Sequence, residues 1–166
     1  RSRLKGVLKS EVGARLAIVC LLARRYDRAL AGLDATNVRN VPAALVTKRR
    51  HLRARALIGL DQSEKALEVL KKDKTTDADL LRAEVFWNGG DWPNASKELR
   101  KILTASGAKK NKPVNPEQTQ KVLNYAIALA LSGNERALAK VRQDYGPAVQ
   151  VTELKDAFRL VSAPTA

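Results

Sequence analysis

The sequence is poor in the residues that most catalytic and metal sites need. His51 is the single histidine, and no cysteine or carboxylate stands at metal-ligand spacing from it. The one cysteine, Cys20, cannot form a disulfide within the chain and is expected to be a small buried apolar residue. No phosphate-binding loop, nucleophile elbow or glycine-rich dinucleotide turn is found. We therefore predict no catalytic residue, no metal and no cofactor, and the chain is not expected to be an enzyme.

Aromatic residues and long apolar runs are also scarce. Aromatics make up 4% of the chain, while Ala and Leu abound, a balance that favours closely packed helices over a β-sandwich. The longest apolar run covers residues 16–23, too short for a bilayer, which needs about 20 residues. We expect no membrane insertion by this segment. A chain that lacks Met and begins at Arg1 is expected to be a fragment of a longer protein.

Apolar residues recur every three or four positions, which predicts eight or nine helices and no strands. Hairpins are expected over residues 5–35, 43–72, 77–105 and 116–145, followed by a terminal helix over 152–161, in one domain that covers 1–166. In the first helix, the stripe formed by Leu8, Val12, Leu16, Val19 and Leu22 is expected to be buried.

Local signals set the expected helix ends. Ser63, Asp91 and Thr152 are candidate N-caps, and Asn115 or Pro116 is expected to start a helix. Glycines after residues 88 and 132 end helices, and Gly146-Pro147 is expected to end the helix that begins at Glu135. The segment 106–116, rich in Lys, Gly and Pro, is predicted to be a loop.

The chain repeats itself. Four turns open a second helix in matching fashion, at Tyr26-Asp-Arg-Ala29, Ser63-Glu-Lys-Ala66, Trp92-Pro-Asn-Ala95 and Asn134-Glu-Arg-Ala137. An apolar residue follows each Ala by four positions, and Ala17, Ala54 and Ala83 precede the first three by twelve. Small residues let two helices approach closely, and hairpins that cannot bury their apolar faces alone must stack on neighbours.

This pattern resembles the tetratricopeptide repeat over roughly residues 10–145. The resemblance implies an all-α, right-handed superhelix of antiparallel hairpins, a TPR-like α-solenoid. It departs from that family where Ser63 and Asn134 replace the usual aromatic and where a Trp is missing from the leading helices. The chain also looks like the carboxy-terminal part of long alphaproteobacterial proteins of this class, and both the bacterial cytoplasm and the cell envelope are compatible with it.

The net charge of +14 is uneven. Residues 1–55 hold 14 Lys and Arg against three acids, whereas the remainder holds 17 against 14. The positive electrostatic field around such a basic segment attracts polyanions or acidic protein surfaces. The densest run lies on the third expected helix, with Lys48, His51 and Arg55 along one line and Arg49 and Arg53 along another.

The resemblance places Lys48, His51 and Arg55 in a concave groove, where cations suit an acidic peptide, a carboxylate or a phosphate. A solvated basic helix face is the plainer interpretation. Trp87 is a further candidate anchor, with core packing as the alternative. Arg24, Arg25 and Arg28 form a second basic cluster, which also suits solvated helix ends.

We expect a non-enzymatic scaffold whose basic groove binds an acidic protein or peptide segment. Nonspecific nucleic-acid binding by the basic N-terminal third is the alternative, although aromatic stacking positions are absent among its cations. A second alternative is that the chain is a helical regulatory domain of a larger protein. The oligomeric state stays open.

Overall fold

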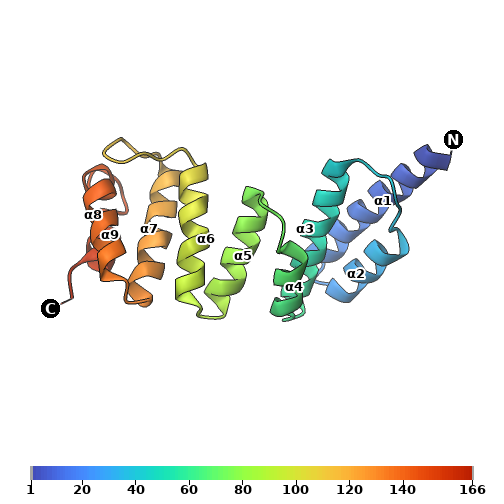
Figure 1. The fold of residues 1–166 in the computed structure, drawn as a ribbon, viewed down its shortest axis with the longest axis horizontal. Helices are drawn as coiled ribbons and strands as arrows, with labels where there is room; N and C mark the ends of the chain where they lie inside the picture. The colour runs from blue at the N-terminus through green and yellow to red at the C-terminus, as the bar shows by residue number, and fades with distance from the viewer. Residues whose placement is uncertain (1, 166) are drawn as a thin grey trace. The chain divides into compact units, whose positions relative to one another are not determined.

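The chain folds into helices throughout. The computed structural model describes residues 2–165, and this part contains nine α-helices and no strand (Figure 1). The predicted all-α class is confirmed. None of these helices is long and apolar enough to cross a membrane. The helices are α1 (Ser2–Leu22), α2 (Tyr26–Ala35), α3 (Ala43–Gly59), α4 (Ser63–Leu70), α5 (Thr76–Asn88), α6 (Trp92–Ala105), α7 (Pro116–Leu131), α8 (Glu135–Val149) and α9 (Lys155–Ser162).

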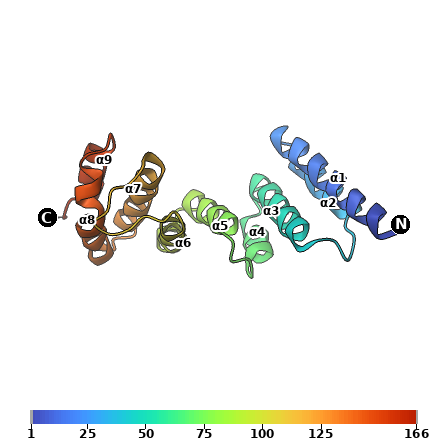
Figure 2. The ribbon, with the colours of Figure 1, turned by 90° about the horizontal axis from the view of Figure 1, so that it is seen from above.

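The helices fall into two compact units, Arg1–Leu81 and Arg82–Ala166, and the division lies within α5. In the first unit, α1 packs on α2 and α3, and α3 also contacts α2 and α4 (Figures 1 and 2). In the second unit, α7 contacts α6, α8 and α9, and α8 contacts α9. Each unit is therefore built from helices that pack on their nearest and next-nearest neighbours in the sequence.

Small residues hold the paired helices close together. The alanines that the repeat pattern singles out are buried at 17, 29, 54, 66, 83 and 95, while Ala137 is half-buried. At the crossing of α1 and α2, a methyl group on Gly13 would collide with the side chain of Thr36. A methyl group on Gly59 of α3 would likewise collide with the ring of Tyr26. Helices at this spacing leave no room for larger side chains.

Four turns between paired helices share one backbone conformation. In each turn, the residue two positions before the first residue of the next helix has a positive φ, in the left-handed region. These residues are Arg24, Asp61, Gly90 and Gly133, with φ of 55°, 59°, 69° and 68°. The following N–H donates to the carbonyl five residues earlier, at 2.7 Å for Arg25, 2.8 Å for Gln62 and Asp91 and 3.0 Å for Asn134. This is the Schellman arrangement that satisfies the last carbonyls of a helix.

These turns predict opposite effects of glycine and alanine. Gly133→Ala should lower the free energy of unfolding by about 1 kcal/mol, because a Cβ disfavours positive φ. Arg24→Gly should raise it by a similar or smaller amount at the equivalent position. Urea denaturation followed by circular dichroism would measure both variants. A stabilising Gly133→Ala would contradict the assignment of this turn.

One prediction about the core was wrong. The stripe of large apolar residues on α1 is exposed, and the buried residues of this helix are Ser10, Gly13, Ala14 and Ala17. Both sets have helical spacing, so periodicity alone could not choose between them. The close approach of α1 to α2 selects the face with the small residues.

Several helix ends also differ from the predictions. Asp91 caps α6 by accepting from the Asn94 N–H, as predicted, and Asn115 forms a capping box with Gln118 at the predicted start of α7. Ser63 instead lies inside α4 and Thr152 precedes α9 without capping it. The helix α8 continues past Gly146 and Pro147, and this continuation buries Val149.

Candidate functional site

The basic run of α3 belongs to the first unit, and its member Arg49 is half-buried. Its guanidinium donates to the carbonyl of Ser10 on α1 at 2.7 Å and to the carbonyl of Leu33 on α2 at 2.7 Å. It also donates to Thr36 Oγ1 at 3.2 Å through both terminal nitrogens. Arg49 therefore links α3 to α1 and α2, a role that the sequence did not predict for it.

The spacing of α3 explains this position. Arg49 lies three residues before Leu52 and seven before Ala56, so it shares the stripe of these two buried residues. Burial lowers the pKa of Arg49, and the charge of nearby Arg53 lowers it further. Two cations that stand this close leave a positive potential around this face of α3.

We predict that Arg49→Met destabilises the fold. The variant keeps an apolar stem but removes the four hydrogen bonds, which should lower the free energy of unfolding by about 1–3 kcal/mol. The control is Arg28→Met on α2, where the side chain is exposed and a change within about 0.5 kcal/mol is expected. Equal midpoints for the two variants in urea would exclude a linking role for Arg49.

A second cluster surrounds the buried carboxylate of Asp73, which lies between α4 and α5. Arg50 donates to its Oδ2 at 2.9 Å, and Nε2 of His51 lies 2.8 Å from the same oxygen. The backbone N–H and the hydroxyl of Thr75 donate to Oδ1 at 2.9 Å and 2.7 Å. Burial alone would raise the pKa of Asp73, but the hydrogen bonds from Thr75, Arg50 and His51 outweigh it and hold that pKa well below its usual range.

This network fixes the role of His51. An ionised carboxylate can only accept hydrogen bonds, so Nε2 of His51 carries a hydrogen and donates it to Asp73. The side chain of His51 is 13% exposed and is directed at a residue of its own chain. Sequence reasoning missed Asp73 because its partners lie 22 and 23 residues away along the chain.

We predict an acid-sensitive contribution from Asp73. Since its pKa is lower in the folded chain than the unfolded value of about 3.9, its stabilisation is complete above that value and is lost as the pH falls towards the folded-state pKa. Asp73→Asn should lower the free energy of unfolding by about 2–4 kcal/mol at pH 7, and this difference should shrink towards pH 2.

Urea titrations over this pH range would measure the effect. The control is Asp34→Asn, which removes an exposed partner of Arg53 and should cost at most about 1 kcal/mol. A difference between wild type and Asp73→Asn that stays constant from pH 7 to pH 2 would show that the carboxylate charge does not stabilise the fold.

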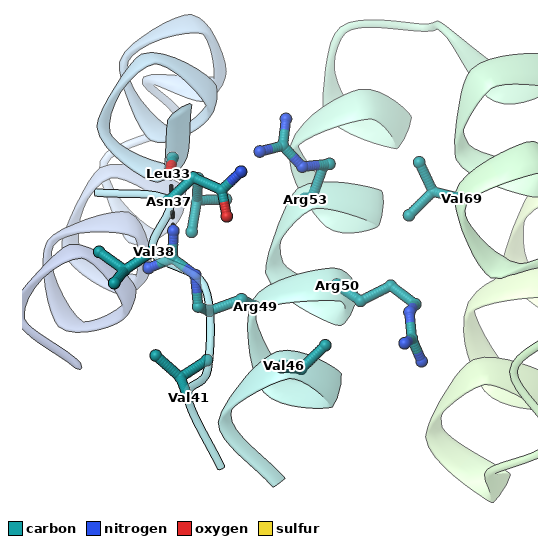
Figure 3. A pocket seen from close by; sticks show the side chains of 9 residues that line it. All are labelled: Leu33, Asn37, Val38, Val41, Val46, Arg49, Arg50, Arg53 and Val69. Atoms are coloured by element: carbon teal, nitrogen blue, oxygen red, sulfur yellow. Dashed lines mark hydrogen bonds between the residues drawn. The ribbon is translucent and has the colours of Figure 1, made fainter. Parts of the chain in front are cut away.

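A pocket of about 280 Å³ opens beside these residues (Figure 3). Five aliphatic side chains line it, contributed by α2, the loop that follows α2, α3 and α4, together with an amide and three guanidinium groups. The lining residues are Leu33, Asn37, Val38, Val41, Val46, Arg49, Arg50, Arg53 and Val69. Figure 3 shows the three guanidinium groups at separate points around the opening, with the bond from Arg49 to Leu33 drawn as a dashed line.

The residues of the two predicted rows on α3 therefore lie in different surroundings. Arg49 and Arg53 lie at the pocket, and Arg53 also donates to Asp34 at 2.7 Å. Lys48 is exposed beside a separate depression between α1 and α3 that Glu11 and Arg15 also line. Arg55 is exposed, whereas His51 is bound to Asp73. The structure does not bring Lys48, His51 and Arg55 together around one pocket.

The other candidates are not among the residues that line this pocket. Trp87 is half-buried and packs edge-to-face on Trp92, with ring centroids 5.1 Å apart. Arg24, Arg25 and Arg28 are all exposed at the turn into α2. The pocket itself was not predicted, although Arg50 belongs to the basic run and Val41 and Val46 flank the helix start at Pro42.

Residues 2–165 contain no group of three or more His, Cys, Asp and Glu side chains placed to hold a metal ion. Comparison of the chain with protein-family models, with curated proteins and with solved structures gives no match. The chemistry of the pocket must therefore be argued from its own residues.

Proposed function

We propose that this chain is a non-enzymatic protein-interaction domain of the tetratricopeptide type, and that its first unit binds an acidic peptide segment at the pocket beside α3. The repeat part of this proposal is supported by the four turns with one hydrogen-bonding pattern and by the alanines buried at equivalent places. A regular succession of hairpins is an architecture that presents extended binding surfaces.

The observation that carries the binding proposal is the combination of an aliphatic lining with three guanidinium groups. Within the described residues, Arg53 bonds to Asp34 alone and Arg50 to Asp73 alone, and a guanidinium has five N–H donors. Donors therefore remain for a carboxylate at the opening. A volume of about 280 Å³ is close to the lower limit for ligand pockets and suits one or two side chains of a peptide.

An acidic segment with an aliphatic residue fits both properties. The aliphatic side chain would enter between Val38, Val41 and Val46, and an adjacent Asp or Glu would pair with Arg53 in a bidentate contact. Nucleic acid is the weaker candidate, because no aromatic ring lines the pocket for a base to stack on.

Peptide binding tests the proposal. The probe is a fluorescein-labelled peptide in which a central Leu is flanked by Asp and Glu, beside a matched peptide with Asn and Gln at the same positions. The acidic peptide should bind more tightly, and Val46→Glu should weaken its binding by about tenfold or more, because it places a carboxylate at the opening. Val46 is 42% exposed, so the fold should tolerate this change.

The matched control is Val151→Glu, which alters the net charge equally at an exposed valine in the second unit. It should leave binding within about twofold of wild type. Equal weakening by the two variants would mean that overall charge alone attracts the peptide. Tighter binding of a labelled single-stranded oligonucleotide, lost with Val46→Glu, would replace the peptide proposal by nucleic-acid binding.

A further inference from the structure

The outer face of α1 carries a continuous apolar stripe. Six of the eleven exposed large apolar residues in the described part of the chain lie on this helix, each between 49% and 81% exposed. They follow one another at intervals of four, four, four, three and three residues and therefore form one row along the helix. The row consists of Leu4, Leu8, Val12, Leu16, Val19 and Leu22.

This row faces away from the buried face of α1, and within it Leu16 also approaches Gly32 of α2. The inner face consists of the small buried residues around Gly13 and Ala14. By contrast α3, at the centre of the same unit, contacts α1, α2 and α4. An apolar row of this length on a folded domain marks an interaction surface, since single exposed apolar residues are common but long contiguous rows are not.

Cations border the row. Lys5 and Lys9 lie one turn apart along one edge, and Arg15 lies between Val12 and Val19 at the other side. All three cations are exposed, and the single acid of this helix, Glu11, is half-buried. The surface therefore combines an apolar centre with positive edges.

We infer that the outer face of α1 binds an amphipathic helix of another protein, one whose apolar stripe is flanked by Asp and Glu. A row with steps of three and four residues is the ridge that fits the groove between side-chain rows of a second helix. Carboxylates along that helix would meet Lys5, Lys9 and Arg15. This surface is separate from the pocket beside α3, and the inference does not depend on peptide binding there.

Charge argues against a second copy of this chain as the occupant. In an antiparallel pair of α1 helices centred on Val12, Lys9 of each copy would face Arg15 of the other, and a parallel pair would place like charges opposite each other along the whole row. A lipid surface is also disfavoured. The row holds Leu and Val without Trp or Phe, the rings that anchor an interfacial helix at a lipid surface.

The test uses synthetic helical peptides of about 20 residues, which match the 21 residues of α1 at 1.5 Å per residue. One peptide carries Leu at every third or fourth position with Glu on both flanks, and its partner has Lys in place of Glu. Fluorescence anisotropy should show binding of the Glu peptide and at least tenfold weaker binding of the Lys peptide, about 1.4 kcal/mol. Lys9→Glu/Arg15→Glu should reverse this preference.

Val12→Glu places a carboxylate in the centre of the row at a position that is 60% exposed, and it should weaken binding of the Glu peptide by about tenfold or more. The matched control is Leu131→Glu on α7, 55% exposed, which should leave binding unchanged, as should Val46→Glu at the pocket. Binding that ignores Val12→Glu, or that treats the two peptides equally, would overturn the inference.

Two further measurements separate the other occupants. A wild-type dimer in sedimentation that Val12→Glu converts to a monomer would assign the row to self-association and overturn the inference. Cosedimentation with phosphatidylglycerol vesicles that Val12→Glu abolishes, with no binding of either peptide, would assign it to a lipid surface and overturn it equally. A monomer that binds the Glu peptide and ignores these vesicles is the expected result.

Discussion

Close approach of helices through residues without bulky side chains is the constraint on which this structure depends. Gly13 lies so near Thr36 that a methyl group would not fit, and Ala29, Ala66 and Ala95 are fully buried at other crossings. Since such small residues bury little apolar area, these crossings gain their stability from tight packing over many atoms rather than from large side chains. The same constraint determines which face of α1 turns inward and leaves its large side chains outside.

The cations of α3 illustrate how one basic run acquires different roles. Arg49 spans from α3 to carbonyls on α1 and α2, whereas Arg50 and His51 turn to Asp73 at the junction of α4 and α5. A fold tolerates partly buried cations when hydrogen-bond acceptors and opposite charges lie beside them. Here the carbonyls supply acceptors, and Asp73 supplies a negative charge. The first unit is therefore organised by polar contacts that also shape its pocket.

Much of the local structure could be predicted from the sequence, because caps and glycines act over a few residues. Asp91, Asn115 and Gly133 mark helix ends as their chemistry requires. The inward face of α1 could not be predicted, since two rows of suitable spacing compete and only the neighbouring helix decides between them. The partnership of Asp73 with Arg50 and His51 was equally hidden, because it joins positions over 20 residues apart. The inward position of Arg49 could have been predicted, because Arg49 has helical spacing to Leu52 and Ala56, which are buried.

The contact between Trp87 and Trp92 has a practical consequence for spectroscopy. These are the two tryptophans of the sequence, and their rings meet edge-to-face at 5.1 Å in the second unit. Intrinsic emission excited at the red edge of the absorption band therefore originates from one place near the turn between α5 and α6. The first unit contributes Tyr26 and no indole, so its melting is invisible to tryptophan emission. Emission and ellipticity recorded on one sample thus follow different parts of the molecule, and a gap between the two curves would measure how independently the units unfold.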